Sequence, residues 1–175
     1  MQTVVVQEAM LLPGFTASAD AFIERLKTVP GTAFNRVPFD GSWSPAQVGD
    51  HVHKFLGGID AALRMPRAEP DRAPDAHEPL LREIFLNFDR KSKAPAIVEP
   101  SKDRIGKEEL ITALAQITGT LCIRISEGNL LARCVGLPFP TIGDMTGMEW
   151  VLFGDYHLQR HTHQLEQMQP FFNKV

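Results

Sequence analysis

Apolar residues recur at spacings of three and four along this chain, and this pattern limits its fold more than any other feature. One such stripe consists of Val48, Val52, Phe55, Ile59 and Leu63, and a later one of Leu110, Leu114, Ile117, Leu121 and Ile125. Residues at this spacing lie on one face of an α-helix. Both segments are therefore predicted to be helices that pack in a helical bundle.

Helix start and stop signals bound two of the long helices. Ser44 is a predicted N-cap, with Pro45 at the first helical position and Gln47 completing a capping box; Pro66 ends this helix. Thr146 and Glu149 form a second capping box, which opens a last helix running to about Met168. The later apolar stripe is predicted to end near residues 128–129.

The other segments carry weaker signals. A short first helix is predicted over residues 18–29, after an irregular N-terminal segment over residues 1–17. Residues 66–79 are rich in Pro, Asp and Ala and are predicted to be loop. A short helix around residues 79–90 interrupts a long connection that ends near Gly106, and residues 134–144 are irregular. A chain of 175 residues suits one domain, so residues 1–175 are predicted to form a single all-α domain.

Charge and composition exclude several classes of partner. The formal net charge is only -3, and the basic residues are scattered, which argues against nucleic acid. No stretch approaches the ~20 apolar residues that span a membrane. Cys122 and Cys134 lack a C-x-x-C spacing, so neither a disulfide framework nor a thiolate zinc cluster is indicated. We expect a cytoplasmic protein.

Helical geometry separates the six histidines. His51 lies on the buried stripe of its helix, whereas His53 is rotated by roughly 200° and faces away. His157 and His161 are an i, i+4 pair on one face of the last helix, and His163 faces elsewhere. Two imidazoles one turn apart can bind the same ion, and a third from a facing helix completes a metal site with open positions.

The same residues have a simpler interpretation as core histidines that hydrogen-bond to backbone, because an i, i+4 pair also arises by chance. No carboxylate or thiolate motif supports the site. Leu158 stands where the helical metalloprotease signature has its glutamate, which disfavours zinc proteolysis. No catalytic residue and no general base can be assigned from the sequence.

Three segments resemble the DinB/YfiT-like superfamily. These are residues 43–51 (WSPAQVGDH), residues 157–165 (HLQRHTHQL) and, leading into the last helix, residues 141–150 (TIGDMTGMEW). The resemblance covers about residues 18–168 in order and spacing, although the connection over residues 66–106 matches none of these segments. It implies a four-helix bundle with a long crossover connection between the second and third bundle helices. It also implies a homodimer and a three-histidine zinc or nickel site, whose ligands fall on His51, His157 and His161.

Three functions remain open at this stage. The first is an enzyme in which the metal activates water or a low-molecular-weight thiol toward a small electrophilic substrate, as in a hydrolase or a thiol S-transferase. Gln164 is then a candidate to orient His161. The second is a non-catalytic, metal-stabilised binding or stress-response module, which predicts a closed coordination sphere with Glu149 or His53 as fourth ligand. The third is a metal-free helical scaffold.

Overall fold

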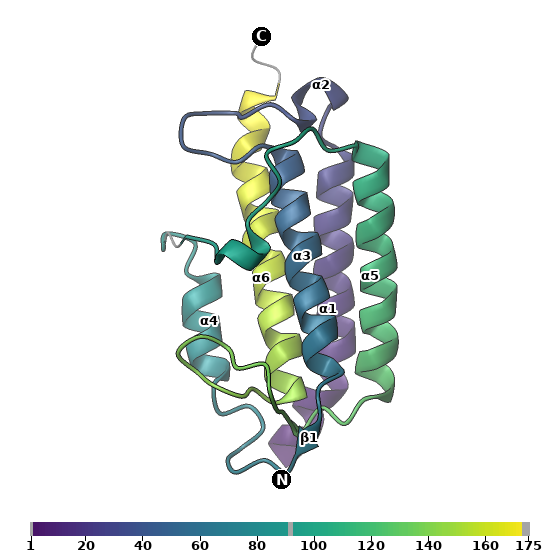
Figure 1. Ribbon diagram of the computed structural model, residues 1–175, viewed down its shortest axis with the longest axis vertical. Coiled ribbons are helices and arrows are strands. Elements are labelled where there is room, and N and C mark those ends of the chain that lie inside the picture. Colours follow the sequence, from purple (N-terminus) through teal and green to yellow (C-terminus); the bar gives the residue numbers. More distant parts are fainter. Residues whose placement is uncertain (1, 91–92, 173–175) are drawn as a thin grey trace.

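The computed structural model describes residues 2–90 and 93–172, and the chain is mostly helical (Figure 1). In chain order the elements are α1 (Gln2–Lys27), α2 (Gly31–Phe34), α3 (Pro45–Leu63), β1 (Arg67–Ala68), α4 (Glu78–Leu86), the 3-10 helix η1 (Ala96–Val98), α5 (Lys107–Glu127), β2 (Arg133–Cys134), α6 (Gly147–Met168) and the 3-10 helix η2 (Gln169–Phe171). The prediction of a mainly helical chain is therefore confirmed.

Four long helices, α1, α3, α5 and α6, lie side by side along the molecule (Figure 1). Helix α1 packs against α5 and α6, and α3 packs against the same two helices. Their apolar faces meet in a core whose largest fully buried side chains include Phe15, Phe22, Leu56, Ile59, Leu114, Leu121 and Leu158. The short helix α4 packs on the outside of α6.

Both predicted capping boxes are present. The Ser44 hydroxyl accepts a hydrogen bond from the Gln47 backbone N–H, and the Gln47 side chain accepts one from the Ser44 N–H. Thr146 and Glu149 make the same reciprocal pair at the start of α6. These boxes satisfy backbone donors that a helix start leaves without partners, so they fix where α3 and α6 begin.

The N-terminal prediction is wrong. Residues 1–17 were expected to be irregular with a helix start at Ser18, but α1 begins at Gln2; residue 1 lies outside the described residues. Pro13 lies inside this helix, where it removes one backbone hydrogen bond, but its side chain is exposed. Leu11 and Phe15 on the opposite face are 5% and 0% exposed. Their burial extends the apolar face past the proline and offsets the lost bond.

Smaller elements also differ from the sequence expectation. Helix α4 spans Glu78–Leu86, beginning one residue earlier and ending four earlier than predicted. The short helix α2 was not predicted, nor was the two-stranded antiparallel pairing of β1 with β2, in which Arg67 faces Cys134 and Ala68 faces Arg133. Strands of two residues carry no periodicity, and this pairing joins segments that are far apart in the sequence.

A glycine sets the distance between the two helices that carry the histidines of interest. A Cβ atom at Gly154 of α6 would lie 2.8 Å from Ile59 Cδ1 of α3 and 3.3 Å from Phe15 Cε2 of α1. A larger residue would therefore push these helices apart.

Among the described residues, no helix combines the length and hydropathy that a membrane span requires.

Candidate metal centre

Helices α3 and α6 bring His51, His157 and His161 together. One ring nitrogen from each side chain lies within 4.8 Å of the others. The ring centroids are 5.4 Å apart for His51 and His157, 4.8 Å for His51 and His161, and 4.7 Å for His157 and His161. These are the residues that helical spacing placed on the inward faces of their helices, and the structure brings them together.

Two of the rings are oriented by hydrogen bonds through Nδ1. His51 Nδ1 lies 2.7 Å from the backbone oxygen of Val98, and His161 Nδ1 lies 2.7 Å from Gln164 Oε1. Both partners are acceptors, so each Nδ1 carries the hydrogen. The Nε2 atom of each ring is then left with a lone pair, which is the form that binds a metal.

The third ring is held by aromatic packing. His157 stacks on Phe55 with centroids 4.2 Å apart and an interplanar angle of 9°. Phe85 and Phe153 flank the same imidazole at 4.8 and 5.1 Å. These rings leave little freedom for the His157 side chain, which favours a fixed position for its nitrogens.

The cluster is electrically neutral at ordinary pH. Desolvation by burial lowers the pKa of all three histidines below the ordinary value of 6.5. The pKa of His161 falls to about 3, with the nearby His51 and Arg160 adding to the effect of burial. The pKa of His157 is lowered well below its usual range, chiefly by desolvation and then by its histidine neighbours.

The donor set fits a divalent metal ion. His157 Nδ1 and His161 Nε2 are buried and have no hydrogen-bond partner in the described part of the chain. Buried polar atoms without partners are uncommon and call for an explanation. Three neutral imidazoles that converge on one point are ligands suited to zinc, nickel, copper or iron.

Other acidic and imidazole groups, including Glu149, lie outside the cluster. Within the described ranges, the cluster around His51 contains no fourth histidine, thiolate or carboxylate. Glu149 is fully buried, but its carboxylate binds Arg72, the backbone of His77 and the Thr146 cap. His77 is the N-cap residue of α4, and Asp155 accepts hydrogen bonds from Ser18 and Gln159. Three histidine ligands alone would leave part of a metal's coordination sphere open.

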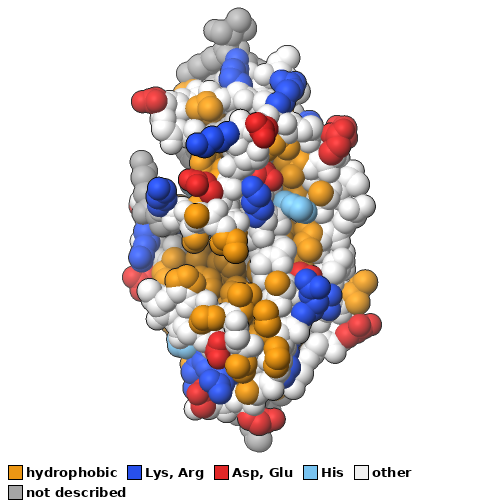
Figure 2. Space-filling view, in the orientation of Figure 1, with side chains coloured by type: hydrophobic (Ala, Val, Ile, Leu, Met, Phe, Trp, Pro, Cys, Tyr) orange, Lys and Arg blue, Asp and Glu red, His pale blue; other side chains and the backbone are white. Residues whose placement is uncertain are grey.

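A large pocket reaches the histidines. Its volume is about 1010 Å³, and it lies between α3, α6, α4, the connection around η1 and residues 137–140. The space-filling view shows an apolar hollow on this face of the molecule, beside α4 (Figure 2). All three histidines contribute to the lining, so a small molecule in the pocket has access to the cluster.

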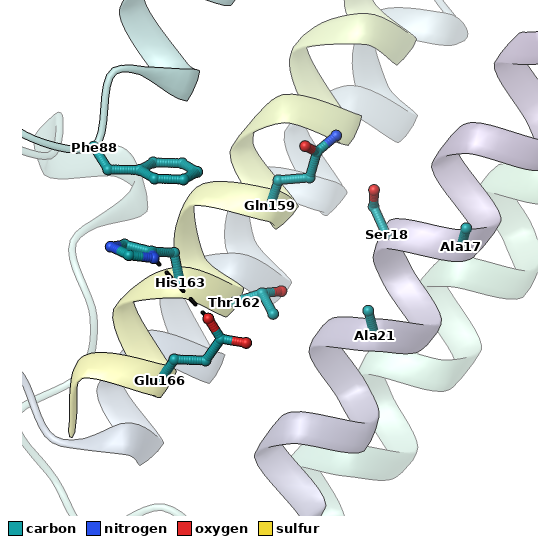
Figure 3. A pocket seen from close by; sticks show the side chains of 8 residues that line it. All are labelled: Ala17, Ser18, Ala21, Phe88, Gln159, Thr162, His163 and Glu166. Carbon is teal, nitrogen blue, oxygen red and sulfur yellow. Dashed lines mark ion pairs between the residues drawn. The ribbon is translucent and has the colours of Figure 1, made fainter. Parts of the chain in front are cut away.

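A second, smaller pocket lies between α1 and α6 (Figure 3). Its lining is mainly small or polar and includes Ala17, Ser18, Ala21 and Thr162, together with the ring of His163. That ring stacks on Phe88 at 4.4 Å and lies 4.0 Å from Glu166, so His163 does not join the cluster. None of the three clustered histidines lines this pocket.

Sequence reasoning missed the part of the site that comes from the long connection. The carbonyl of Val98 orients His51, and Lys54 donates to the carbonyl of Glu99 at 2.8 Å. The backbone N–H of Ser101 donates to Asp50 Oδ2 at 2.8 Å. Two of these three contacts use a backbone carbonyl as acceptor, which every residue has, so the sequence offered no signal for them.

Comparison with known proteins gives two matches of different kinds. The family model described as DinB superfamily matches residues 15–165. The uncharacterized protein YuaE of Bacillus subtilis (strain 168) is 29% identical over 147 residues, which cover 82% of this chain and 87% of that relative. No solved structure matches the chain.

Proposed function

The chain belongs to the DinB superfamily, and we propose that it is a metal-dependent enzyme whose ion is bound by His51, His157 and His161. The observation that carries this proposal is the convergence of three neutral ring nitrogens, within 4.8 Å of one another, on a pocket of about 1010 Å³. Zinc and nickel are the ions we expect, since imidazole suits both.

A divalent ion held by the three histidines would act as a Lewis acid, and it would lower the pKa of a water or a low-molecular-weight thiol that then serves as nucleophile toward a small electrophilic substrate. The protein supplies the geometry. Val98 and Gln164 hold two imidazoles in the tautomer that presents Nε2, and Phe55 restrains the third. The aromatic side chains Phe55, Phe85 and Phe153 around His157 make the surroundings of the cluster apolar.

The open side of the cluster favours an enzyme over a metal-stabilised structural module. A structural ion prefers a closed set of four protein ligands, whereas a catalytic ion keeps a position for water or substrate. Three histidines that face a pocket match the second arrangement.

We further propose that α1, α3, α5 and α6 form a four-helix bundle, with the connection between α3 and α5 as its long crossover. The whole chain is then one domain. From the family resemblance we also propose that the protein is a homodimer. Light scattering, which measures the molar mass in solution, tests this.

The function is tested by metal-dependent turnover. Protein loaded with zinc or nickel is assayed for conjugation of a thiol to 1-chloro-2,4-dinitrobenzene and for hydrolysis of 4-nitrophenyl acetate. We expect the metal-loaded protein to accelerate one of these reactions. Chelation and the substitution His157→Ala should each remove the acceleration, because both remove the ion from the pocket.

The substitution His53→Ala is the matched control, since His53 lies on α3 outside both the cluster and the lining of the large pocket. It should retain the activity of the wild type. Equal rates for metal-loaded and metal-free protein in both reactions would contradict the proposed enzyme.

A further inference from the structure

The walls of the large pocket are unusually aromatic for a space that must hold only a metal ion and a water. Among the described residues, eight aromatic side chains line it: Phe39, Trp43, Phe55, Phe85, Phe88, Phe139, Trp150 and Phe153. Phe139 contacts both Trp150 and Phe153, at centroid distances of 5.7 and 5.1 Å. Aromatic walls stabilise a ligand by removing its apolar surface from water, so the pocket favours a ligand with a sizeable apolar body.

Exposed apolar side chains at the same pocket support this requirement. Among the described residues, seven large hydrophobic side chains are exposed, and three of them, Phe39, Phe88 and Ile97, belong to the pocket lining. Ile97 is the most exposed of the seven, at 87%. Leaving such surface in water is unfavourable by about 25 cal/mol per Å², and an apolar ligand that covers these side chains recovers part of it.

The pocket lining carries a positive charge that no nearby carboxylate balances. Arg160 lies on α6 between His157 and His161, and its guanidinium donates to two backbone oxygens, those of Asn87 (2.9 Å) and Arg90. No carboxylate within the described ranges forms an ion pair with it. A guanidinium has five N–H donors, so Arg160 keeps donors for a ligand.

The remaining charges on the lining are those of Lys54, Lys93 and Glu99, and they do not cancel that of Arg160. Lys54 is paired with Asp50 at 2.9 Å, so its charge is already balanced. Glu99 is the one carboxylate among the described lining residues, and it is exposed. The three histidines are neutral, so they add no charge of either sign.

We propose that this pocket binds an organic anion with a bulky apolar body, whose anionic group pairs with Arg160 while its apolar part packs on the aromatic walls. The proposal names the substrate class for the enzyme proposed above and rests on that function for the reaction. The binding itself depends on Arg160 and the aromatic walls, so it is testable without the ion.

The probes are 1-naphthaleneacetate and its neutral counterpart 1-naphthaleneacetamide, which differ little except in charge, with acetate as the anion that lacks an apolar body. Their dissociation constants are measured by isothermal titration calorimetry on the chelated protein. We expect the naphthalene anion to bind about tenfold more tightly than the amide, the effect of one partly desolvated ion pair. Acetate should bind far more weakly than either, because it covers no apolar surface.

The variant Arg160→Gln should bring the two naphthalene ligands to within about twofold of each other, while Arg160→Lys should retain most of the preference for the anion. The control Arg104→Gln makes the same change of net charge at an exposed loop residue outside the pocket and should leave the preference unchanged. Circular dichroism checks that Arg160→Gln retains its helices.

Three outcomes overturn the inference: equal affinities of wild type for the naphthalene anion and amide, binding of neither at millimolar concentration, or a preference that survives in Arg160→Gln. Metal uptake, measured on the same preparations, separates this result from the metal proposal. An Arg160-dependent preference in a protein that takes up no zinc or nickel supports the anion site and contradicts the metal site. Full metal uptake with equal ligand affinities does the reverse.

Discussion

At the scale of single residues, the central feature is a set of three imidazoles kept neutral inside an apolar site. Burial is the main cause of the lowered pKa values, and the neighbouring histidines and Arg160 add to it. Neutral imidazole is the form that binds a metal, so the fold holds these side chains ready for an ion. The same burial makes the metal-free protein sensitive to acid.

The metal-free protein should lose stability as pH falls below about 6.5, where histidines of the unfolded chain become protonated. The folded-state pKa of His161 is about 3, so between these two values the unfolded state binds a proton that the folded state does not. Unfolding is thereby favoured. At pH 5.5 the loss from His161 alone is about 1 kcal/mol.

Urea unfolding of chelated protein at pH 7.5 and pH 5.5 measures this loss. The variant His161→Gln, which does not titrate, should lose about 1 kcal/mol less than the wild type between the two pH values. His163→Gln, on the same helix but outside the cluster, serves as the control. The explanation fails if His161→Gln loses as much stability on acidification as the wild type does.

Helical spacing predicted the inward faces of His51, His157 and His161, and the family resemblance added that these faces meet, because spacing alone does not decide which helices pack together. Gln164 follows His161 by one helical turn, so its position beside that ring was predictable from helical spacing. The roles of Val98 and Arg160 were not. Val98 contributes a backbone oxygen, and the significance of Arg160 depends on which carboxylates lie near it in space.

At the scale of elements, the starts of α3 and α6 were predicted correctly because each capping box is local, within four residues. The start of α1 was not. Pro13 and Gly14 look like a turn in the sequence, and only packing against other helices shows that Leu11 and Phe15 belong to one continuous apolar face. The β1–β2 pair was missed because its strands are too short to show a pattern.

The buried carboxylate of Glu149 binds the connection between α3 and α5 to the start of α6. Glu149 Oε2 lies 2.7 Å from Arg72 Nη2, and Oε1 accepts from the His77 N–H at 2.9 Å. Glu149→Gln keeps the shape of the side chain but leaves Arg72 with only its ion pair to the exposed Asp71, at 3.2 Å. We expect the free energy of unfolding to fall by roughly 2 to 4 kcal/mol, somewhat less than for a fully buried pair because Arg72 is partly exposed.

The matched control is Glu166→Gln, the same change at another α6 glutamate paired with an arginine. Glu166 and Arg25 lie 3.1 Å apart, but both side chains are substantially exposed, so the loss should stay below about 1 kcal/mol. Chemical denaturation of the two variants compares them directly. Equal effects would show that Glu149 does not anchor the connection.

At the scale of the whole molecule, the histidine cluster joins helices that are distant in the sequence. His51 lies on α3, His157 and His161 lie on α6, and the η1 segment of the connection between α3 and α5 supplies the acceptor for His51. An ion bound at this point links α3 to α6 and indirectly holds the connection over the pocket. Binding to the folded state alone should therefore stabilise the entire fold.

The most direct test is the amount of metal bound per chain, measured by mass spectrometry on tag-free protein after zinc and nickel have been offered. We compare the wild type with His51→Ala, which removes the α3 ligand, and with His53→Ala, which makes the same change on α3 outside the cluster. Our account predicts close to one ion per chain in the wild type and in His53→Ala, and loss of the ion in His51→Ala. A metal-free wild type, or metal retained in full by His51→Ala, would contradict it.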